Sequence, residues 1–306
     1  MLRRWFARTI GYARLFCIGF LIALAALRIA DPAGLEEIRL RTFDTFQLID
    51  PRVKTARPVT IIDIDEKSLA KLGQWPWPRT RIADMIINLT RLGAVVIAFD
   101  IVFAEPDRLN TDAVADSIRY LDEVTRAKLR ALPSNDQIFA DAIRRSRVVL
   151  GETGLPEVLT EFDKSLPVTG LAMLGEEPRP FLLDFPGLLR NIHALEEAAA
   201  GRGLFSIKPE RDGIVRRVPM LMQAQGTILP SLSFEILRVV ASTRTILVKS
   251  EKSGLRASPS AVWSFPPIST DGFGSISRIA ILQSIFRRST YLMKVSPPRQ
   301  LRANWC

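Results

Sequence analysis

Two short runs of β-branched and aliphatic residues, on either side of an amphipathic segment, constrain the fold of this 306-residue chain most. Residues 59–65 (VTIIDID) and 94–99 (AVVIAF) are typical of buried strands. Between them, residues 81–92 repeat apolar side chains at helical spacing, with Thr80 as the expected N-cap and Gly93 as the expected C-terminal stop. A strand–helix–strand unit of this length predicts two parallel strands joined by a right-handed crossover.

The remaining segments predict an α/β domain built on a central mixed sheet. Three further elements are expected: a helix at residues 135–146, a strand from residue 148, and a helix at residues 230–240 that Ser231 or Ser233 caps. Residues 201–222 predict an antiparallel hairpin whose turn contains Asp212 and Gly213. Residues 106–134 are polar and favour a loop with one solvated helix.

An apolar run near the N-terminus predicts one transmembrane helix ahead of this domain. Residues 15–27 (LFCIGFLIALAAL) carry no charge and would cover about 20 Å as a helix. Counting residues 13–30, with the Arg14 and Arg28 side chains reaching outward, gives a helix long enough to cross a bilayer. Basic residues gather before the run and acidic ones after it, so the N-terminus should stay in the cytoplasm. Residues 36–50 then favour a helix leaving the membrane.

Two other interpretations of the apolar run remain open. It could be a cleaved signal peptide, because Ala23, Leu24 and Ala25 provide a small-x-small cleavage site. It could also be a buried helix in the core of a domain. The cysteine content does not discriminate among the three interpretations.

Charge and motif content argue against nucleic-acid binding and against catalysis. The formal net charge is +10, but the basic residues are scattered among acidic ones and form no run interleaved with aromatic side chains. Cys17 and Cys306 are the only cysteines and His193 is the only histidine, which rules out thiolate or histidine-clustered metal sites. Phosphate-binding and nucleophile motifs are also missing, so we expect no catalytic residue and no cofactor.

Acidic side chains follow both strands of the predicted strand–helix–strand unit. They are Asp63, Asp65, Glu66, Asp100, Glu105 and Asp107. The carboxyl ends of parallel strands open on one edge of a sheet, where ligands usually bind, and carboxylates there could hold Mg²⁺ or Ca²⁺. The alternative is that they cap the following helices or pair with arginines such as Arg79 and Arg108.

The string at residues 74–79 (QWPWPR) adds the remaining candidates, Trp75, Trp77 and Arg79. Its two prolines fix an extended path, so both indoles sit on a stiff segment. Such a segment can form an aromatic lid over a ligand pocket or a hydrophobic staple that closes one edge of the sheet. Together with the six carboxylates, these three residues form the predicted ligand-binding set.

The last stretch of the chain has an unusual composition. From Gly272 to Cys306 there is no acidic residue, and hydrophobic residues occur without a clear period. We expect neither a sheet strand nor a membrane helix there. Two interpretations are open: a disordered basic tail, or loss of the natural reading frame after Gly274, which would truncate the protein.

Several strings together resemble the type-two branch of the CHASE family, the cyclase/histidine-kinase-associated sensory extracellular domains. They are residues 63–69 (DIDEKSL), 72–79 (LGQWPWPR) and 100–107 (DIVFAEPD), with residues 40–44 (LRTFD) and 212–219 (DGIVRRVP) in support. The resemblance covers about residues 36–272. The combination of WPWPR with FDIVFAEPD is the most specific part.

This resemblance implies a bacterial inner-membrane receptor with its sensor in the periplasm and a cytoplasmic cyclase or kinase as output. The implied organisation is a cytoplasmic N-terminus (1–14), a single transmembrane helix (15–30), the sensor domain (36–272) and an atypical tail (273–306).

The expected function is therefore that of an anchored extracytoplasmic sensor, not an enzyme, that lacks its output domain. Its expected partners are the lipid bilayer, an extracytoplasmic ligand and, by analogy, a second copy of the chain. The competing hypothesis is an anchored or secreted metal-dependent hydrolase that uses the carboxylates at the strand ends.

Overall fold

The computed structural model describes residues 2–30, 32–51, 59–158, 167–251, 254–259 and 279–283. Residues 2–11, 13, 251, 254–259 and 279–283 are described by their backbone alone. The chain divides into two compact units, residues 1–56 and residues 57–306.

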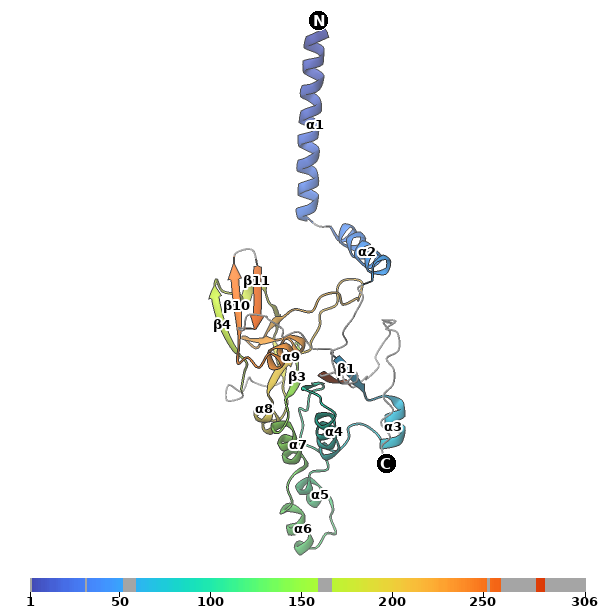
Figure 1. Cartoon of the computed structure of the whole chain (residues 1–306), viewed down its shortest axis with the longest axis vertical. Helices are drawn as coiled ribbons and strands as arrows, with labels where there is room; N and C mark the ends of the chain where they lie inside the picture. The colour runs from blue at the N-terminus through green and yellow to red at the C-terminus, as the bar shows by residue number, and fades with distance from the viewer. Residues whose placement is uncertain are drawn as a thin grey trace, which may run out of the picture. The chain divides into compact units, whose positions relative to one another are not determined.

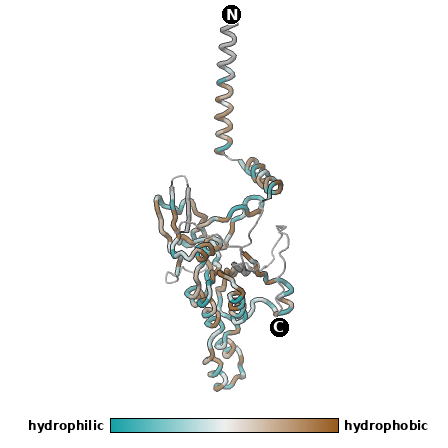
Figure 2. The backbone as a smooth tube through the Cα atoms, viewed as in Figure 1, coloured by the Kyte–Doolittle hydropathy of each residue, from teal (hydrophilic) through white to brown (hydrophobic). Residues whose placement is uncertain are grey.

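Two helices make up the described part of the first unit. Helix α1 (Leu2–Ala30) contains the apolar run, and helix α2 (Ala33–Ile49) confirms the helix predicted from residue 36, although it begins three residues earlier (Figure 2). Judged by length and composition, no single helix of the described residues qualifies as a membrane span. The segments Arg14–Ala30 and Ala33–Ile49 qualify only as a pair, with a bend of 82° between them.

The second unit is built on a mixed sheet in which β12 (Ile279–Gln283) lies between β1 (Val59–Asp63) and β2 (Val96–Asp100) (Figure 1). Next to β2 lies β3 (Val148–Leu155), which also pairs with β7 (Gly201–Leu204). These five strands are parallel to one another. Strand β6 (Gly187–Leu189) pairs antiparallel with the end of β3. The mixed sheet and the parallel orientation of the first two strands are thus confirmed.

Strand β12 corrects the expectation that no strand follows Gly274. It pairs in parallel with β1 on one side and with β2 on the other, so Ile279 lies level with both Val59 and Val96. A strand with neighbours on both sides shows no alternation of polar and apolar residues, because parallel sheets are usually covered on both faces. The five residues of β12 therefore produced no periodic signal within the basic stretch.

Helices cover both faces of this sheet. On one face lie α4 (Arg79–Arg91), α7 (Asn135–Arg144) and α8 (His193–Ala198), and on the other lies α9 (Leu232–Val240). Strand β2 shows why both faces are apolar. Its Ile97 and Phe99 pack under α4 and α7, whereas Val96 and Ala98 pack against α9.

Several boundaries and burials differ from the sequence predictions. Strand β1 is not buried, since it lies at the edge of the sheet and leaves the Ile61 side chain 63% exposed. Helix α4 begins at Arg79, before Thr80, and Pro78 precedes it without a side-chain cap. Proline has no side-chain acceptor, so it cannot bond the free N–H groups of the first helical turn. The right-handedness of the crossover stays a prediction.

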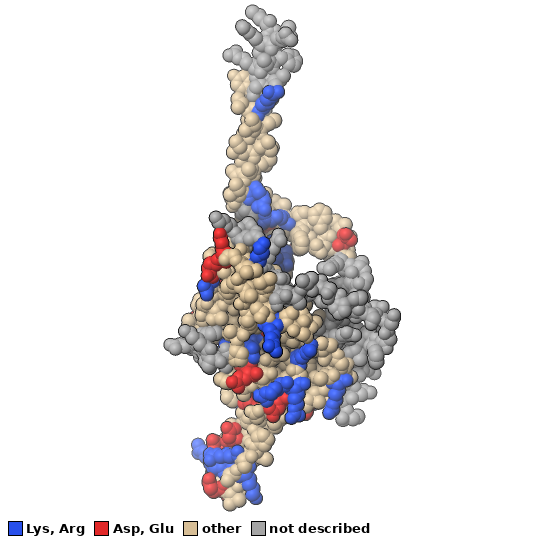
Figure 3. Space-filling model, turned by 60° about the vertical axis from the view of Figure 1, so that its left-hand side comes forward, with Lys and Arg blue, Asp and Glu red and all other residues tan. Residues whose placement is uncertain are grey.

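Two helices replace the single one expected between residues 106 and 134. They are α5 (Thr111–Ser117) and α6 (Glu123–Arg130), and Asp122 caps the second. Figure 3 shows basic and acidic side chains mixed on the tip that these helices form. Arg130 and Asp116 form an ion pair across them. The polar composition was correctly interpreted as solvated, but the break at residues 118–122 was missed.

Two small sheets complete the described part of the second unit. Strand β10 (Thr245–Glu251) pairs in parallel with β4 (Gly170–Gly175) and antiparallel with β11 (Gly254–Pro259). Strand β8 (Leu221–Ala224) pairs in parallel with β5 (Leu183–Phe185) and antiparallel with β9 (Thr227–Pro230). A 3₁₀ turn, η1 (Arg179–Phe181), precedes β5. Helix α3 (Glu66–Leu72) follows β1.

The hairpin predicted at residues 201–222 is wrong. A turn does form at Asp212 and Gly213, where Gly213 has φ +80°, but no described strand flanks it directly. The true hairpin joins β8 and β9 through Gln225 and Gly226, with φ +47° and +75°. A non-glycine residue with positive φ is uncommon, so the sequence gives this turn little signal.

Helices α7 and α9 and strand β3 are confirmed close to their predicted positions. Ser134 caps α7, and Ser231, not Ser233, caps α9 by accepting a hydrogen bond from the Phe234 N–H. These elements carry the charged side chains described next.

Candidate functional site

Two of the six predicted carboxylates lie at the same edge of the sheet. Asp63 and Asp100 end β1 and β2, and both lie level with Gln283 of β12. They are separated by one strand, or about 10 Å between backbones. Burial raises the pKa of both carboxyl groups, and Asp65 adds to the rise at Asp63. Among the residues whose side chains are described, no group of three or more His, Cys, Asp or Glu could hold a metal ion.

Asp65 and Glu66 are occupied with starting helix α3. The Asp65 carboxylate accepts hydrogen bonds from the N–H and the hydroxyl of Ser68, both at 2.8 Å. These bonds lower the pKa of Asp65. Glu66 is exposed in the first turn of the same helix. At Asp65 the structure matches the helix-capping alternative.

Trp75 and Trp77 pack edge to face, with ring centroids 5.7 Å apart. Trp77 is buried in the core beneath α4, and its indole N–H donates to the Gly73 carbonyl at 2.8 Å. Trp75 is partly buried against the same core. This packing is that of the hydrophobic staple, one of the two roles considered for the string.

Arg79 anchors a buried network that joins the start of α4 to the start of α7. Its guanidinium lies 3.6 Å from Asp136, over the Phe103 ring at 4.5 Å, and bonds the Glu105 carbonyl at 3.2 Å. The backbone N–H of Arg79 donates to the Asp107 carboxylate at 2.8 Å. Burial lowers the pKa of Arg79, and Asp136 and Asp107 oppose the shift. The structure therefore joins three predicted residues, Arg79, Glu105 and Asp107, although Glu105 contributes its carbonyl and its side chain is exposed.

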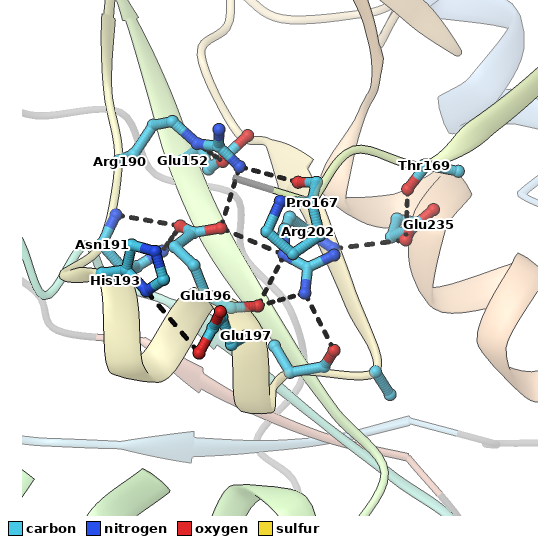
Figure 4. Close-up of polar contacts among 12 residues, drawn as sticks. Glu152, Pro167, Thr169, Arg190, Asn191, His193, Glu196, Glu197, Arg202 and Glu235 are labelled. Atoms are coloured by element: carbon cyan, nitrogen blue, oxygen red, sulfur yellow. Dashed lines mark hydrogen bonds and ion pairs between the residues drawn. The ribbon is translucent and has the colours of Figure 1, made fainter. Parts of the chain in front are cut away.

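A second buried network, absent from the predicted set, lies around strands β3 and β7 (Figure 4). Its charged members are Glu152 of β3, Arg190 after β6, Glu196 of α8, Arg202 of β7, and Glu235 and Arg238 of α9. We call these six residues the Arg/Glu cluster. All three carboxylates are at most 1% exposed.

Glu196 is at the centre of the Arg/Glu cluster. One of its carboxylate oxygens lies 3.0 Å from both Arg190 and Arg202 (Figure 4). The other accepts hydrogen bonds from the backbone and side-chain N–H groups of Asn191, at 3.0 and 2.9 Å. Asn191 also accepts a bond from the Phe103 N–H at 2.8 Å. Glu196 thus receives a donor on each oxygen.

Glu152 is less completely bonded than Glu196. Its Oε1 accepts a 2.7 Å bond from Arg190 Nε, whereas its buried Oε2 has no hydrogen-bond partner among the described residues. Burial raises the pKa of Glu152 to about 7; Glu196 adds to the rise, and Arg190 and Arg202 oppose it. Burial also lowers the pKa of Arg202. A group titrating near neutrality is therefore enclosed in the fold.

Glu235 extends the cluster towards the small sheet of β4, β10 and β11. It pairs with Arg238 through both oxygens, at 2.7 and 2.8 Å, and accepts a bond from the Thr169 hydroxyl at 2.8 Å. The Arg202 N–H also donates to it at 3.2 Å. A side chain at Gly201 would clash here, because its Cβ would lie 2.4 Å from the Glu235 carboxylate. Glycine at this position lets α9 approach β7.

A comparison with known protein families shows which family the chain belongs to. The model of the CHASE2 domain matches residues 18–300. The chain belongs to the CHASE2 domain family. CHASE2 domains are extracellular or periplasmic sensor domains of cyclases and kinases, and they are not catalytic. Curated proteins and solved structures yielded no match.

The family match confirms the resemblance on which the expected sensor role rested. It assigns no role to individual residues, so the nine predicted ligand-binding residues of this CHASE2 domain stay a prediction. Their geometry favours structural roles for Asp65, Trp77 and Arg79. The expected lipid, ligand and homodimer partners, and the expected lack of nucleic-acid binding, also stay predictions.

The Arg/Glu cluster of the CHASE2 domain was missed because its members are spread over residues 152–238. One local signal was available. Residues 232–240 (LSFEILRVV) place Glu235 and Arg238 three residues apart within an otherwise apolar helix. A charged pair at this spacing shares one helix face, and its apolar neighbours indicate that the face is buried.

Proposed function

We propose that this CHASE2 domain is the sensor part of a bacterial membrane receptor, and that residues 15–30 anchor it in the inner membrane. The α/β unit would then lie on the periplasmic side. The observation that carries the proposal is the family match over residues 18–300. It begins within the apolar run, so part of the proposed anchor is included in the family pattern.

The exposed surface of α1 supports the anchor. Between Arg14 and Arg28 the helix presents large apolar side chains, such as Phe16 at 74% exposure and Leu21 at 64%. Exposed apolar surface of this extent marks an interaction with lipid or with another protein. The arginines before the run favour a cytoplasmic N-terminus.

A reporter fused after Cys306 tests the location of the sensor. We expect alkaline phosphatase, which is active only after export, to be active in the membrane fraction, and a cytosol-dependent fluorescent protein to be dark. The double variant L21R/L24R should abolish export, since each arginine at a helix centre costs about 2.5–3.5 kcal/mol of insertion free energy. The matched control Y12R lies before the run and should leave export intact. A cytosolic reporter on the wild-type chain would refute the proposal.

Mass spectrometry of the mature protein separates an anchor from a signal peptide. We expect Met1 or Leu2 at the N-terminus and retention in the membrane after a high-salt wash. A soluble periplasmic product that lacks residues 1–25 would replace the anchor with a cleaved leader.

We further propose that the intact receptor carries a cyclase or kinase output domain. The suggested loss of the reading frame was placed after Gly274, but strand β12, which lies inside the sheet, extends beyond that residue to Gln283. Sequencing the DNA downstream of codon 274 in all three frames tests this proposal. Output-domain motifs in any frame would support it, and their absence over the following kilobases would refute it.

A further inference from the structure

The Arg/Glu cluster concentrates an unusual amount of charge in the interior. Three carboxylates and three guanidinium groups from β3, β7, α8, α9 and the segment after β6 enclose one another in the described part of the fold. Ionised groups are costly to bury, and the cost is offset only if each finds partners. With all six ionised the cluster is neutral, so the gain of one proton changes its balance by a full charge.

Glu152 is the carboxylate of the cluster that would bind a proton most readily. The charged groups that face it are Arg190 from the segment after β6, Glu196 from α8 and Arg202 from β7. Glu235 and Arg238 of α9 lie beyond Arg202. The Oε2 atom of Glu152 is buried without a donor among the described residues, and Glu196 competes with Glu152 for Arg190. Two carboxylates that share one arginine disfavour simultaneous ionisation.

Protonation of Glu152 would change what Arg190 holds. The groups that Arg190 bonds include Glu152 at 2.7 Å, Glu196 at 3.0 Å and the Pro167 carbonyl at 2.9 Å. Bonds between two ionised partners are about twice as strong as neutral ones. A neutral Glu152 would therefore bind Arg190 less strongly, while the bonds of Arg190 to Glu196 and to the Pro167 carbonyl would remain.

This rearrangement would take place a few residues before the small sheet of β4, β10 and β11. Pro167 is three residues before β4, and Thr169, one residue before β4, bonds Glu235 of the same cluster. Arg238 bonds the Thr243 carbonyl at 2.6 Å, just before β10, the partner of β4. The Arg/Glu cluster thus holds the starts of two paired strands.

We propose that Glu152 is a proton-binding site of this sensor and that its protonation state sets how Arg190 holds the segment leading into β4. The proposal rests on the proposed function only in making the proton an external stimulus, since a periplasmic domain is exposed to the external pH. The proton itself binds by forming an O–H bond on a Glu152 carboxylate oxygen.

Unfolding of the full chain in detergent, measured by denaturant titration from pH 5.5 to 7.5, tests the proton site. A buried carboxyl whose pKa rises on folding binds more protons in the folded state, so stability falls as pH rises. The unfolding constant of the wild type should rise about tenfold per pH unit up to about pH 6.5 and level off above pH 7. Glu152→Gln should remove this rise, because an amide does not titrate.

Glu235→Gln is the matched control. It makes the same substitution in the same cluster, at a carboxylate with donors on both oxygens, and it should retain the rise. An unchanged pH dependence in Glu152→Gln would refute the proton site. Loss of the rise in both variants would refute the assignment to Glu152.

Hydrogen exchange of residues 167–175, compared at equal intrinsic rates, tests the link to β4. Protection there should change between pH 6 and pH 8 in the wild type and in Glu235→Gln but not in Glu152→Gln. Identical protection at both pH values in the wild type would refute the link.

If Glu152→Gln does not fold, infrared difference spectra of the wild type decide. A band of a protonated carboxyl should disappear between pH 6 and pH 8, where exposed carboxyls are already ionised. Its absence would overturn the proposal. These readouts concern the folded chain in either compartment, so they are separate from the reporter fusion, which tests location alone.

Discussion

Asp136 and Glu152 are both buried carboxylates beside arginine at the same sheet, but their surroundings differ. All four oxygens of Asp136 and its neighbour Asp107 accept hydrogen bonds, from backbone N–H groups and from the amides of Asn110 and Asn135. Among the described residues, Glu152 has a donor on only one oxygen, and it shares Arg190 with Glu196. Neutral amide donors stabilise a carboxylate without adding a competing charge, whereas a shared arginine couples two carboxylates.

Burial of a carboxylate therefore does not by itself make it responsive to pH. The Arg79 network is cross-braced by donors that do not titrate near neutrality, which suits a joint between α4 and α7. The Arg/Glu cluster is braced by charges alone at Glu152, so one proton alters it.

Asp136→Ala should cause the largest loss. It leaves the Arg79 guanidinium buried without its carboxylate, and breaking a buried pair typically costs about 3–5 kcal/mol of unfolding free energy. Asp141→Ala is the matched control on the same helix, where an exposed ion pair with Arg144 should contribute no more than about 1 kcal/mol. Denaturant unfolding at pH 7 measures both. Equal losses would show that the Arg79 network is not the joint described.

Gly201→Ala should destabilise the Arg/Glu cluster by steric conflict. Its Cβ would lie 2.4 Å from the Glu235 carboxylate, and overpacking of this kind costs about 1–3 kcal/mol. Gly170→Ala is the control, because its nearest neighbour would be 3.5 Å away, an ordinary contact. Thermal unfolding of both variants checks the difference. A Gly201→Ala protein as stable as the wild type would contradict the close approach of α9 to β7.

Asp212→Asn extends the comparison to an exposed carboxylate. The Arg216 side chain bonds Asp212 at 2.6 Å and lowers the pKa of Asp212 to about 2. A carboxyl with a depressed folded pKa contributes stability above its unfolded pKa and loses it as pH falls. The variant should therefore melt slightly below the wild type at pH 7, and the difference should shrink between pH 4 and pH 2. A difference that grows on acidification would reverse this assignment.

Divalent cations should have the smallest effect. Mg²⁺, Ca²⁺ or Mn²⁺ at millimolar concentration should leave the melting temperature of the full chain unchanged, since a cation that binds only the folded state would raise it. Asp63 and Asp100 are one strand apart, and Asp65 is already bonded to Ser68. A clear rise with one cation would instead favour the metal-dependent hydrolase.

The sequence predicted what periodicity encodes and missed what pairing across the chain decides. Strands β2 and β3 and helices α4, α7 and α9 were found because each carries its own apolar pattern. The hairpin was misplaced because the Asp212–Gly213 turn is a strong local signal without strands to join. Strand β12 was missed because its position between two strands, not its five residues, makes it a strand.

The candidate site divides in the same way. Arg79 and Asp107 were both in the predicted ligand-binding set because they lie close to one strand–helix–strand unit in sequence. Glu152, Glu196 and Glu235 come from three separate elements, and only the fold brings them to a common set of arginines. Which carboxylate lacks a donor depends on atomic geometry that no spacing rule encodes.

The insertion of β12 between β1 and β2 has a consequence for how the protein is made. The strands that flank it are complete after residue 100, but they cannot close the sheet until residues 279–283 have emerged from the ribosome. Pairing across so long a stretch of chain slows folding and leaves strand edges open in the meantime. A nascent chain of this kind therefore exposes those strand edges until residues 279–283 have been synthesised.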